Sequence, residues 1–155
     1  MKLILGDKAY STWSLRPWLV LKRCGADFDE VMVGLNLPDT AEAIARHVPA
    51  GKVPALEVDG VTIWDSLAIT LWAEERFPDA PLWPADPHAR WVARSTVCEM
   101  HSAFGTLRGD LGMGPDHPMH VEQDQPHAPS DALSADVRRM IAMWRMSVDS
   151  ASDGT

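Results

Sequence analysis

The sequence predicts an α/β domain followed by an all-α C-terminal region. Three observations indicate this class: strand and helix signals alternate in the first half, prolines cluster near residue 80, and helical periodicity dominates afterwards. Alternating strands and helices are typical of an α/β domain. With 155 residues, the chain is long enough for one domain or two small ones.

The first two elements are a buried strand and a helix. Residues 2–6 form a short apolar run, as expected for a buried strand. A helix is expected to begin near Ser14, its predicted N-cap, because Leu15, Trp18 and Leu19 recur at helical spacing. Together these segments begin a strand–helix alternation.

A second strand over residues 28–35, a short helix over residues 40–47 and a β-hairpin follow. Asp59-Gly60 suits a two-residue type I′ turn, because both central residues of that turn need positive φ. The flanking segments 55–58 and 61–64 are predicted as the two strands of the hairpin.

A further helix begins directly after the hairpin. Asp65-Ser66 occupies its N-cap position, and the free N–H groups at such a helix end favour a carboxylate. Strand, helix, strand, helix, hairpin and helix is the order of a thioredoxin-like domain. We place this domain at residues 1–80.

The second half is predicted to be helical around an irregular loop. Residues 81–87 are rich in proline and are predicted as an interdomain linker. A partial helical domain over 88–155 follows, with an irregular loop over 112–133 and a helix over 134–147. A helix over about 88–108 is expected from a one-sided apolar stripe. The stripe consists of Ala93, Val97, Met100, Phe104 and Leu107.

Charge and composition exclude several classes of function. The net charge of −8 argues against nucleic-acid binding, which needs clustered Lys and Arg. Cys24 and Cys98 have neither metal-type nor redox-type spacing and indicate a reducing compartment. Because neither a signal segment nor a membrane span is evident, we expect a cytoplasmic protein. The histidines of the loop, His117, His120 and His127, lie in a proline-rich context that does not organise ligands, so no metal site is predicted.

Two segments carry a resemblance to a known family. Gly51-Lys52-Val53-Pro54-Ala55-Leu56 and Trp64-Asp65-Ser66-Leu67-Ala68-Ile69 resemble the N-terminal domain of the glutathione S-transferases, most of all the zeta and maleylacetoacetate-isomerase-like branch. The resemblance implies that Val53 pairs main chain to main chain with the cysteinyl part of glutathione and that Pro54 is cis. It also implies that Asp65 and Ser66 bind the γ-glutamyl group. Lys52 is expected at the negative end of the tripeptide.

The loop Tyr10-Ser11-Thr12-Trp13-Ser14-Leu15-Arg16 resembles the serine-rich activating motif of the same family. Ser11, with Thr12 as the alternative, is the expected catalytic hydroxyl that stabilises the glutathione thiolate. Trp13 is placed with the glutathione-binding residues. The zeta pattern has a cysteine at that position, which counts against maleylacetoacetate isomerisation. The implied function is a glutathione transferase that uses glutathione as co-substrate to attack or isomerise a small electrophile.

The resemblance fails in the second half. The family carries a larger helical domain, so the sequence predicts a truncated all-α C-terminal domain. An alternative is therefore a non-catalytic binding or interaction module. In either case, the stripe on the helix around residues 88–108 predicts a homodimer, because an exposed stripe of this size is unusual on a monomer.

Overall fold

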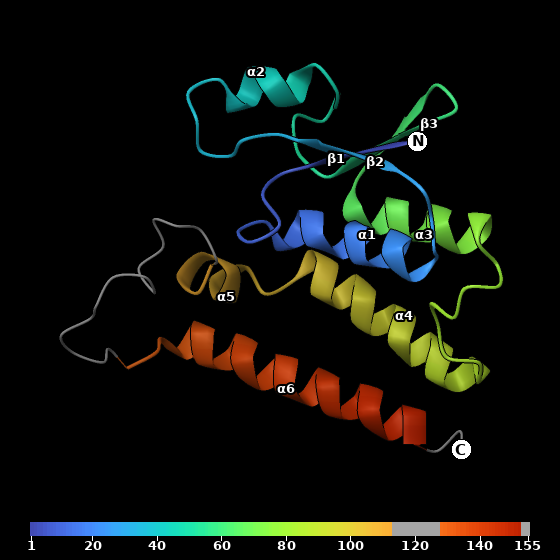
Figure 1. The fold of residues 1–155 in the computed structure, drawn as a ribbon. Coiled ribbons are helices and arrows are strands. Elements are labelled where there is room, and N and C mark those ends of the chain that lie inside the picture. Colours follow the sequence, from blue (N-terminus) through green and yellow to red (C-terminus); the bar gives the residue numbers. More distant parts are fainter. Residues whose placement is uncertain (113–127, 153–155) are drawn as a thin grey trace. The chain divides into compact units, whose positions relative to one another are not determined.

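The computed structural model describes residues 1–112 and 128–152. The chain forms two compact units, Met1–Leu82 and Trp83–Thr155. The first unit contains the β-sheet, and the described part of the second is helical (Figure 1). The assignment of residues 81–87 as a linker stays a prediction.

The sheet of the first unit has four strands: β1 (Lys2–Leu5), β2 (Asp29–Met32), β3 (Ala55–Val58) and β4 (Val61–Ile63). Their spatial order is β2-β1-β3-β4. The β1 and β2 strands are parallel, whereas β3 is antiparallel to both β1 and β4. The sheet is therefore mixed.

Three helices belong to the first unit: α1 (Thr12–Arg23), α2 (Thr40–Ala45) and α3 (Ser66–Arg76). Helices α1 and α3 lie side by side on one face of the sheet, and α2 lies on the other (Figure 1). The predicted order of strand, helix, strand, helix, hairpin and helix is confirmed.

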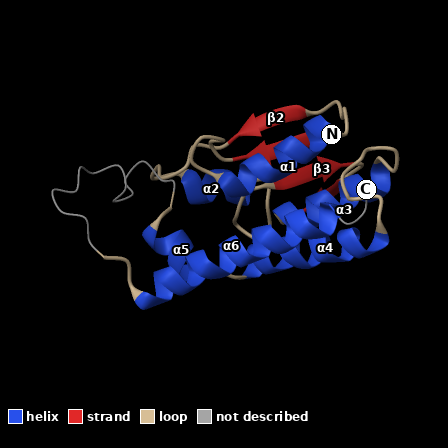
Figure 2. Cartoon of the chain, turned by 90° about the horizontal axis from the view of Figure 1, so that it is seen from below, coloured by secondary structure: helices blue, strands red, loops and turns tan. Residues whose placement is uncertain are grey.

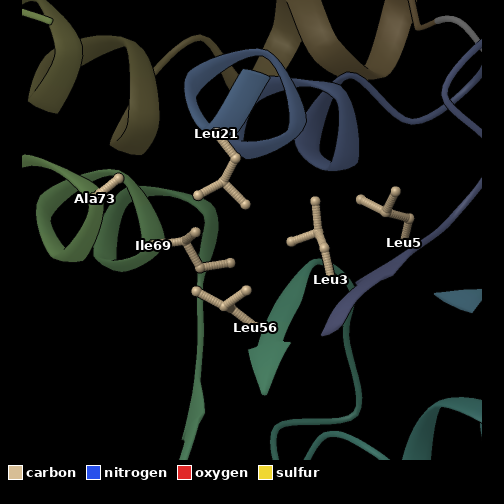
Figure 3. Packing of buried hydrophobic residues seen from close by; sticks show 6 residues of the cluster. All are labelled: Leu3, Leu5, Leu21, Leu56, Ile69 and Ala73. Carbon is tan, nitrogen blue, oxygen red and sulfur yellow. The ribbon is translucent and has the colours of Figure 1, made fainter. Parts of the chain in front are cut away.

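The core has two layers because successive strand residues face opposite sides of the sheet. Leu3, Leu5 and Leu56 pack against α1 and α3, and Figure 3 shows them facing Leu21 and Ile69. The alternate residues pack toward α2 on the opposite face. That second cluster consists of Ile4, Ala55, Val33, Ile44 and Val48.

The hairpin turn has the predicted backbone. Asp59 has φ +49° and Gly60 has φ +78°, as a type I′ turn requires. Val58 pairs with Val61 next to this turn, so the register of the hairpin begins there. The hairpin prediction is confirmed.

The start of α1 differs from the prediction. Ser11 is the N-cap, with its side chain accepting a hydrogen bond from Ser14 N, and Ser14 lies inside the first turn. The predicted apolar face is also wrong in part, because Leu19 is 52% exposed whereas Pro17 and Leu21 are buried. The helix therefore begins earlier and faces the sheet with a different set of residues.

The described residues of the second unit contain α4 (Pro87–Ser102), α5 (Gly105–Asp110) and α6 (Asp131–Ser152). The predicted single helix over 88–108 is wrong, because Phe104 adopts a left-handed conformation with φ +64° and ends the helical path. This break divides the predicted stripe between two helices.

Helix α6 is longer than predicted. Ser130 starts it: its hydroxyl accepts a hydrogen bond from Leu133 N and its carbonyl accepts one from Ser134 N. Residues 131–133, predicted as loop, are therefore helical. The remainder of the predicted loop over 112–133 lies mostly outside the described residues, as do His117, His120 and His127.

Helices α4 and α6 run side by side (Figures 1 and 2). Met143 is buried, and Thr96 and Ser147 share a hydrogen bond of 3.1 Å between their hydroxyls. Within residues 1–112 and 128–152, none of the helices is long and apolar enough to cross a lipid bilayer.

Candidate functional site

The strand register brings three segments to one end of the sheet. Ile4 pairs with Ala55, and Leu56 pairs with Ile63. Because β3 is antiparallel to both neighbours, the chain leaving β1, the chain entering β3 and the chain leaving β4 meet at the same end. The predicted site residues all lie in these segments or at the helix starts that follow them.

The first segment is the loop from Asp7 to Ser11, which connects β1 to α1. The Asp7 carbonyl accepts hydrogen bonds from Tyr10 N at 3.2 Å and Ser11 N at 2.7 Å. The Asp7 carboxylate accepts another from Ala9 N at 2.7 Å. This turn delivers Ser11 to the N-terminus of α1, where the positive end of the helix dipole favours an anion.

Ser11 and Ser14 form a pair of hydroxyls at this helix end. Ser11 Oγ donates to Ser14 Oγ at 3.0 Å, and Ser14 N donates to Ser11 Oγ at 3.3 Å. Ser14 is fully buried, and its Oγ also accepts a hydrogen bond of 2.9 Å from Gly6 N at the end of β1. The pair therefore connects the sheet end to the first turn of α1.

Thr12 and Trp13 occupy the next two positions on α1, and both are half-buried. Within the described residues, the Thr12 hydroxyl has no hydrogen-bond partner. The guanidinium of Arg16 lies 4.1 Å from the centroid of the Trp13 ring. This stacking places an aromatic ring and a cation together on the first two turns of α1.

The second segment enters β3. The Val53-Pro54 peptide bond is cis, as the family resemblance implies. Pro54 is buried and Val53 is half-buried, whereas Lys52 is exposed. The backbone of Val53 thus lies just before the strand, with a cation beside it.

The third segment leaves β4 and starts α3. Asp65 is the N-cap of α3 and accepts a hydrogen bond of 3.0 Å from Leu67 N through its carboxylate. Ser66 is buried at the first helical position, and its carbonyl accepts a hydrogen bond from Thr70 Oγ1 at 2.9 Å. The predicted N-cap is confirmed, and a carboxylate and a hydroxyl are adjacent at a helix N-terminus.

Lys8, Trp18 and Glu30 form a side-chain cluster that the sequence does not predict. The cluster connects the first loop to β2 and α1. The Glu30 carboxylate on β2 accepts hydrogen bonds from Lys8 and from Trp18 Nε1, the latter at 2.6 Å. The Lys8 ammonium also lies 4.6 Å from the centroid of the Trp18 ring. The hydrogen bond from Lys8, and secondarily the one from Trp18, hold the pKa of Glu30 below its usual range. Since Lys8 and Glu30 are far apart in sequence, no local pattern indicates this contact.

The histidines of the metal prediction lie outside the described residues. In the ranges 1–112 and 128–152, no group of three or more His, Cys, Asp or Glu side chains is arranged to hold a metal ion. The groups at the candidate site are hydroxyls, one acidic N-cap, one lysine and two helix N-termini.

The strand order and the order of helices and strands place the first unit in the thioredoxin-like class. Residues 10–76 match the family model described as glutathione S-transferase, N-terminal domain. The first unit therefore resembles the N-terminal domain of the glutathione S-transferases. The earlier resemblance is thereby confirmed.

Curated relatives carry the zeta and isomerase names. The chain is 39% identical over 84 residues to a probable maleylacetoacetate isomerase of Caenorhabditis elegans, covering 54% of this chain and 38% of the relative. It is 36% identical to glutathione S-transferase Z1 of Arabidopsis thaliana, covering 55% and 41%. A maleylacetoacetate isomerase of Pseudomonas aeruginosa is 36% identical over 110 residues, covering 65% and 50%. The chain thus spans half or less of the length of these relatives.

Solved structures agree on the fold. A sphingomonad glutathione S-transferase complexed with glutathione matches with a TM-score of 0.59 and 27% identity, covering 92% of this chain and 65% of that one. The apo form of human glutathione S-transferase T1-1 matches with a TM-score of 0.65 at 23% identity, covering 94% and 60%. The α/β thioredoxin-like class followed by helices is confirmed.

Proposed function

We propose that this chain binds glutathione at the shared end of its sheet and activates the thiol for attack on, or isomerisation of, a small electrophile. In this proposal, glutathione is a co-substrate. The observation that carries the proposal is the strand register, which gathers the starts of α1 and α3 with the Val53-Pro54 segment at one end of the sheet.

Each segment has a role that suits its chemistry. Asp65 pairs with the ammonium of the γ-glutamyl group, and Ser66 with the N-terminus of α3 holds its carboxylate. Val53, fixed by the cis Pro54, pairs its main chain with the cysteinyl residue. Lys52 faces the carboxylate at the other end of the tripeptide.

The sulfur lies at the start of α1 in this proposal. A free cysteine thiol has a pKa of about 8.5, so it is mostly protonated at neutral pH. Lowering that pKa by two units takes about 2.7 kcal/mol, and one hydroxyl donating to a charged acceptor supplies roughly 1.5 to 3 kcal/mol. Ser11 or Thr12 supplies that hydrogen bond, the dipole of α1 adds to it, and Trp13 borders the sulfur.

Calorimetric titration of the protein with glutathione tests the binding site. We expect binding in the wild type and its loss in Asp65→Asn, because this variant keeps an N-cap side chain but removes the charge that pairs with the ammonium. Asp65→Ala removes both. Unchanged affinity in Asp65→Asn would contradict the role of this carboxylate.

The chain offers a matched control for the loss of a helix cap. Asp86 is the N-cap of α4, where its carboxylate accepts a hydrogen bond of 2.7 Å from Ala89 N. Asp86→Ala therefore removes a comparable cap in the second unit. It is expected to leave glutathione affinity unchanged, so a loss of binding in both aspartate variants would indicate a general effect of destabilisation.

Assembly and localisation complete the proposal. We infer a homodimer through α4, whose Trp91 is 60% exposed, and a cytoplasmic location. A concentration-independent monomer mass in sedimentation would contradict the dimer. The named relatives are transferases and isomerases, so the comparisons give no support to a non-catalytic module.

A further inference from the structure

The buried hydroxyl of Ser14 has no part in the function proposed above. Its side chain is fully buried, yet it connects two segments of the site. Ser14 Oγ accepts from Gly6 N at 2.9 Å and from Ser11 Oγ at 3.0 Å. A buried hydroxyl must be hydrogen-bonded, and the partners of Ser14 lie at the end of β1 and at the helix cap instead of in the preceding turn of its own helix.

In the structure the Ser11 hydroxyl donates to Ser14, and activation of the thiol requires the opposite direction. Each hydroxyl both donates and accepts, so a rotation about the two C–O bonds reverses the hydrogen bond without moving an oxygen. In the reversed state, Gly6 N–H donates to Ser14, Ser14 donates to Ser11, and Ser11 is left with a proton to donate outward. No proton changes its oxygen in this step.

A chain of hydrogen bonds in this order strengthens its last donor. Each bond polarises the next, and the effect is larger in a buried setting than in water. The backbone N–H of Gly6 is fixed at the end of β1, where Leu5 pairs with Met32. The sheet therefore provides a rigid first donor for a chain that ends at Ser11.

We propose that Ser14 is a positioning residue for glutathione activation, which orients the Ser11 hydroxyl and lets it donate to the sulfur through the chain Gly6 N–H, Ser14 Oγ–H, Ser11 Oγ–H. This inference rests on the proposed function. It selects Ser11 over Thr12 as the hydroxyl on the sulfur, because Ser11 is the one in contact with Ser14.

The test is a double-mutant cycle read out as the pKa of the bound glutathione thiol, followed through the ultraviolet absorbance of the thiolate. Ser11→Ala is expected to raise that pKa by about one to two units, since the donor is lost. Ser14→Ala is expected to raise it by about half a unit to one unit, since a neutral hydrogen bond behind the donor is lost.

The cycle separates positioning from a structural role. If Ser14 acts through Ser11, adding Ser14→Ala to Ser11→Ala produces no further rise in the thiol pKa. In a Thr12→Val background, Ser14→Ala keeps its full effect. An unchanged pKa in Ser14→Ala, or an equal rise with and without Ser11, would overturn the inference.

Two further variants serve as a control and as a substitute for a variant that does not fold. Ser147→Ala removes a similar hydroxyl contact, at 3.1 Å from Thr96, in the second unit, and is expected to leave the thiol pKa unchanged. If Ser14→Ala does not fold, Ser14→Cys keeps a small side chain with a weaker donor and is expected to raise the pKa by less. An unchanged pKa in the folded Ser14→Cys variant would then overturn the inference.

Failure of the inference and failure of the proposed function give different results. No binding of glutathione by the wild type in calorimetry would overturn the proposed function and this inference with it. Binding with a lowered thiol pKa that is insensitive to Ser14 would leave the proposed function standing and overturn the role of Ser14 alone.

Discussion

Glu99 on α4 and Arg139 on α6 form a two-point ion pair, in which both guanidinium hydrogen bonds reach the carboxylate, the second at 2.6 Å. The hydrogen bond and charge of Arg139 hold the pKa of Glu99 below its usual range. The pair joins the two long helices of the second unit.

This ion pair predicts an acid-dependent loss of stability. A lowered folded-state pKa stabilises the folded protein above the ordinary glutamate value of 4.5, and this stabilisation is lost as the pH falls through the folded value. We expect Glu99→Gln to lower the melting temperature slightly at neutral pH and not at strongly acidic pH. Melting curves by circular dichroism check this, and an equal difference at both pH values would contradict it.

The core of the first unit predicts a contrast between two leucines of α1. Leu21 is fully buried, whereas Leu19 is 52% exposed. Leu21→Ala should lower the free energy of unfolding by about 2 to 5 kcal/mol because it leaves a cavity. Leu19→Ala should change it by at most about 0.5 kcal/mol. Urea denaturation of the two variants measures the difference, and similar losses would refute the packing of α1 described above.

Backbone conformation predicts opposite effects of alanine at Gly60 in the hairpin turn and at Gly109 in α5. Gly60 has φ +78°, and an added Cβ there meets no atom within 4 Å, so Gly60→Ala should cost about 1 to 2 kcal/mol through the backbone alone. Gly109 in α5 is also unobstructed and lacks a positive φ. Gly109→Ala should therefore stabilise the protein by up to about 1 kcal/mol. Thermal unfolding decides the sign of each change.

The two cysteines should differ in reactivity. Burial raises the pKa of the Cys24 thiol, and Cys98 is exposed. Because the thiolate is the reactive form, Cys98 should be alkylated before Cys24 at neutral pH. Mass spectrometry of the partly alkylated protein identifies the modified residue, and Cys98→Ala should remove the fast phase. Faster labelling of Cys24 would contradict its burial.

The elements that local chemistry specifies were predictable from the sequence. The Asp59-Gly60 turn and the Asp65 cap each depend on residues that are neighbours in the chain, and both are confirmed. The break at Phe104 was not predictable, because an aromatic residue rarely adopts positive φ and the apolar stripe continued across it.

The candidate site was predictable only in part. Its residues came from a family resemblance, and their gathering at one sheet end follows from a strand pairing that single segments do not reveal. Ser14 was predicted as the N-cap of α1, a position that Ser11 holds, because both serines fit a helix start. The Lys8–Glu30 contact joins a loop to a separate strand, which periodicity does not detect.

The hairpin also sets the spacing of the proposed ligand groups. Its turn lies at the opposite end from Pro54 and Asp65, so the pairing register of its two strands determines how far apart these two residues are. One residue inserted into a single arm would shift that arm by about 3.4 Å and turn its side chains to the other face. Lengthening the turn itself leaves both arms in register. The tip between Val58 and Val61 is thus where new sequence can be added, for example a label or an affinity tag, without altering the ligand end.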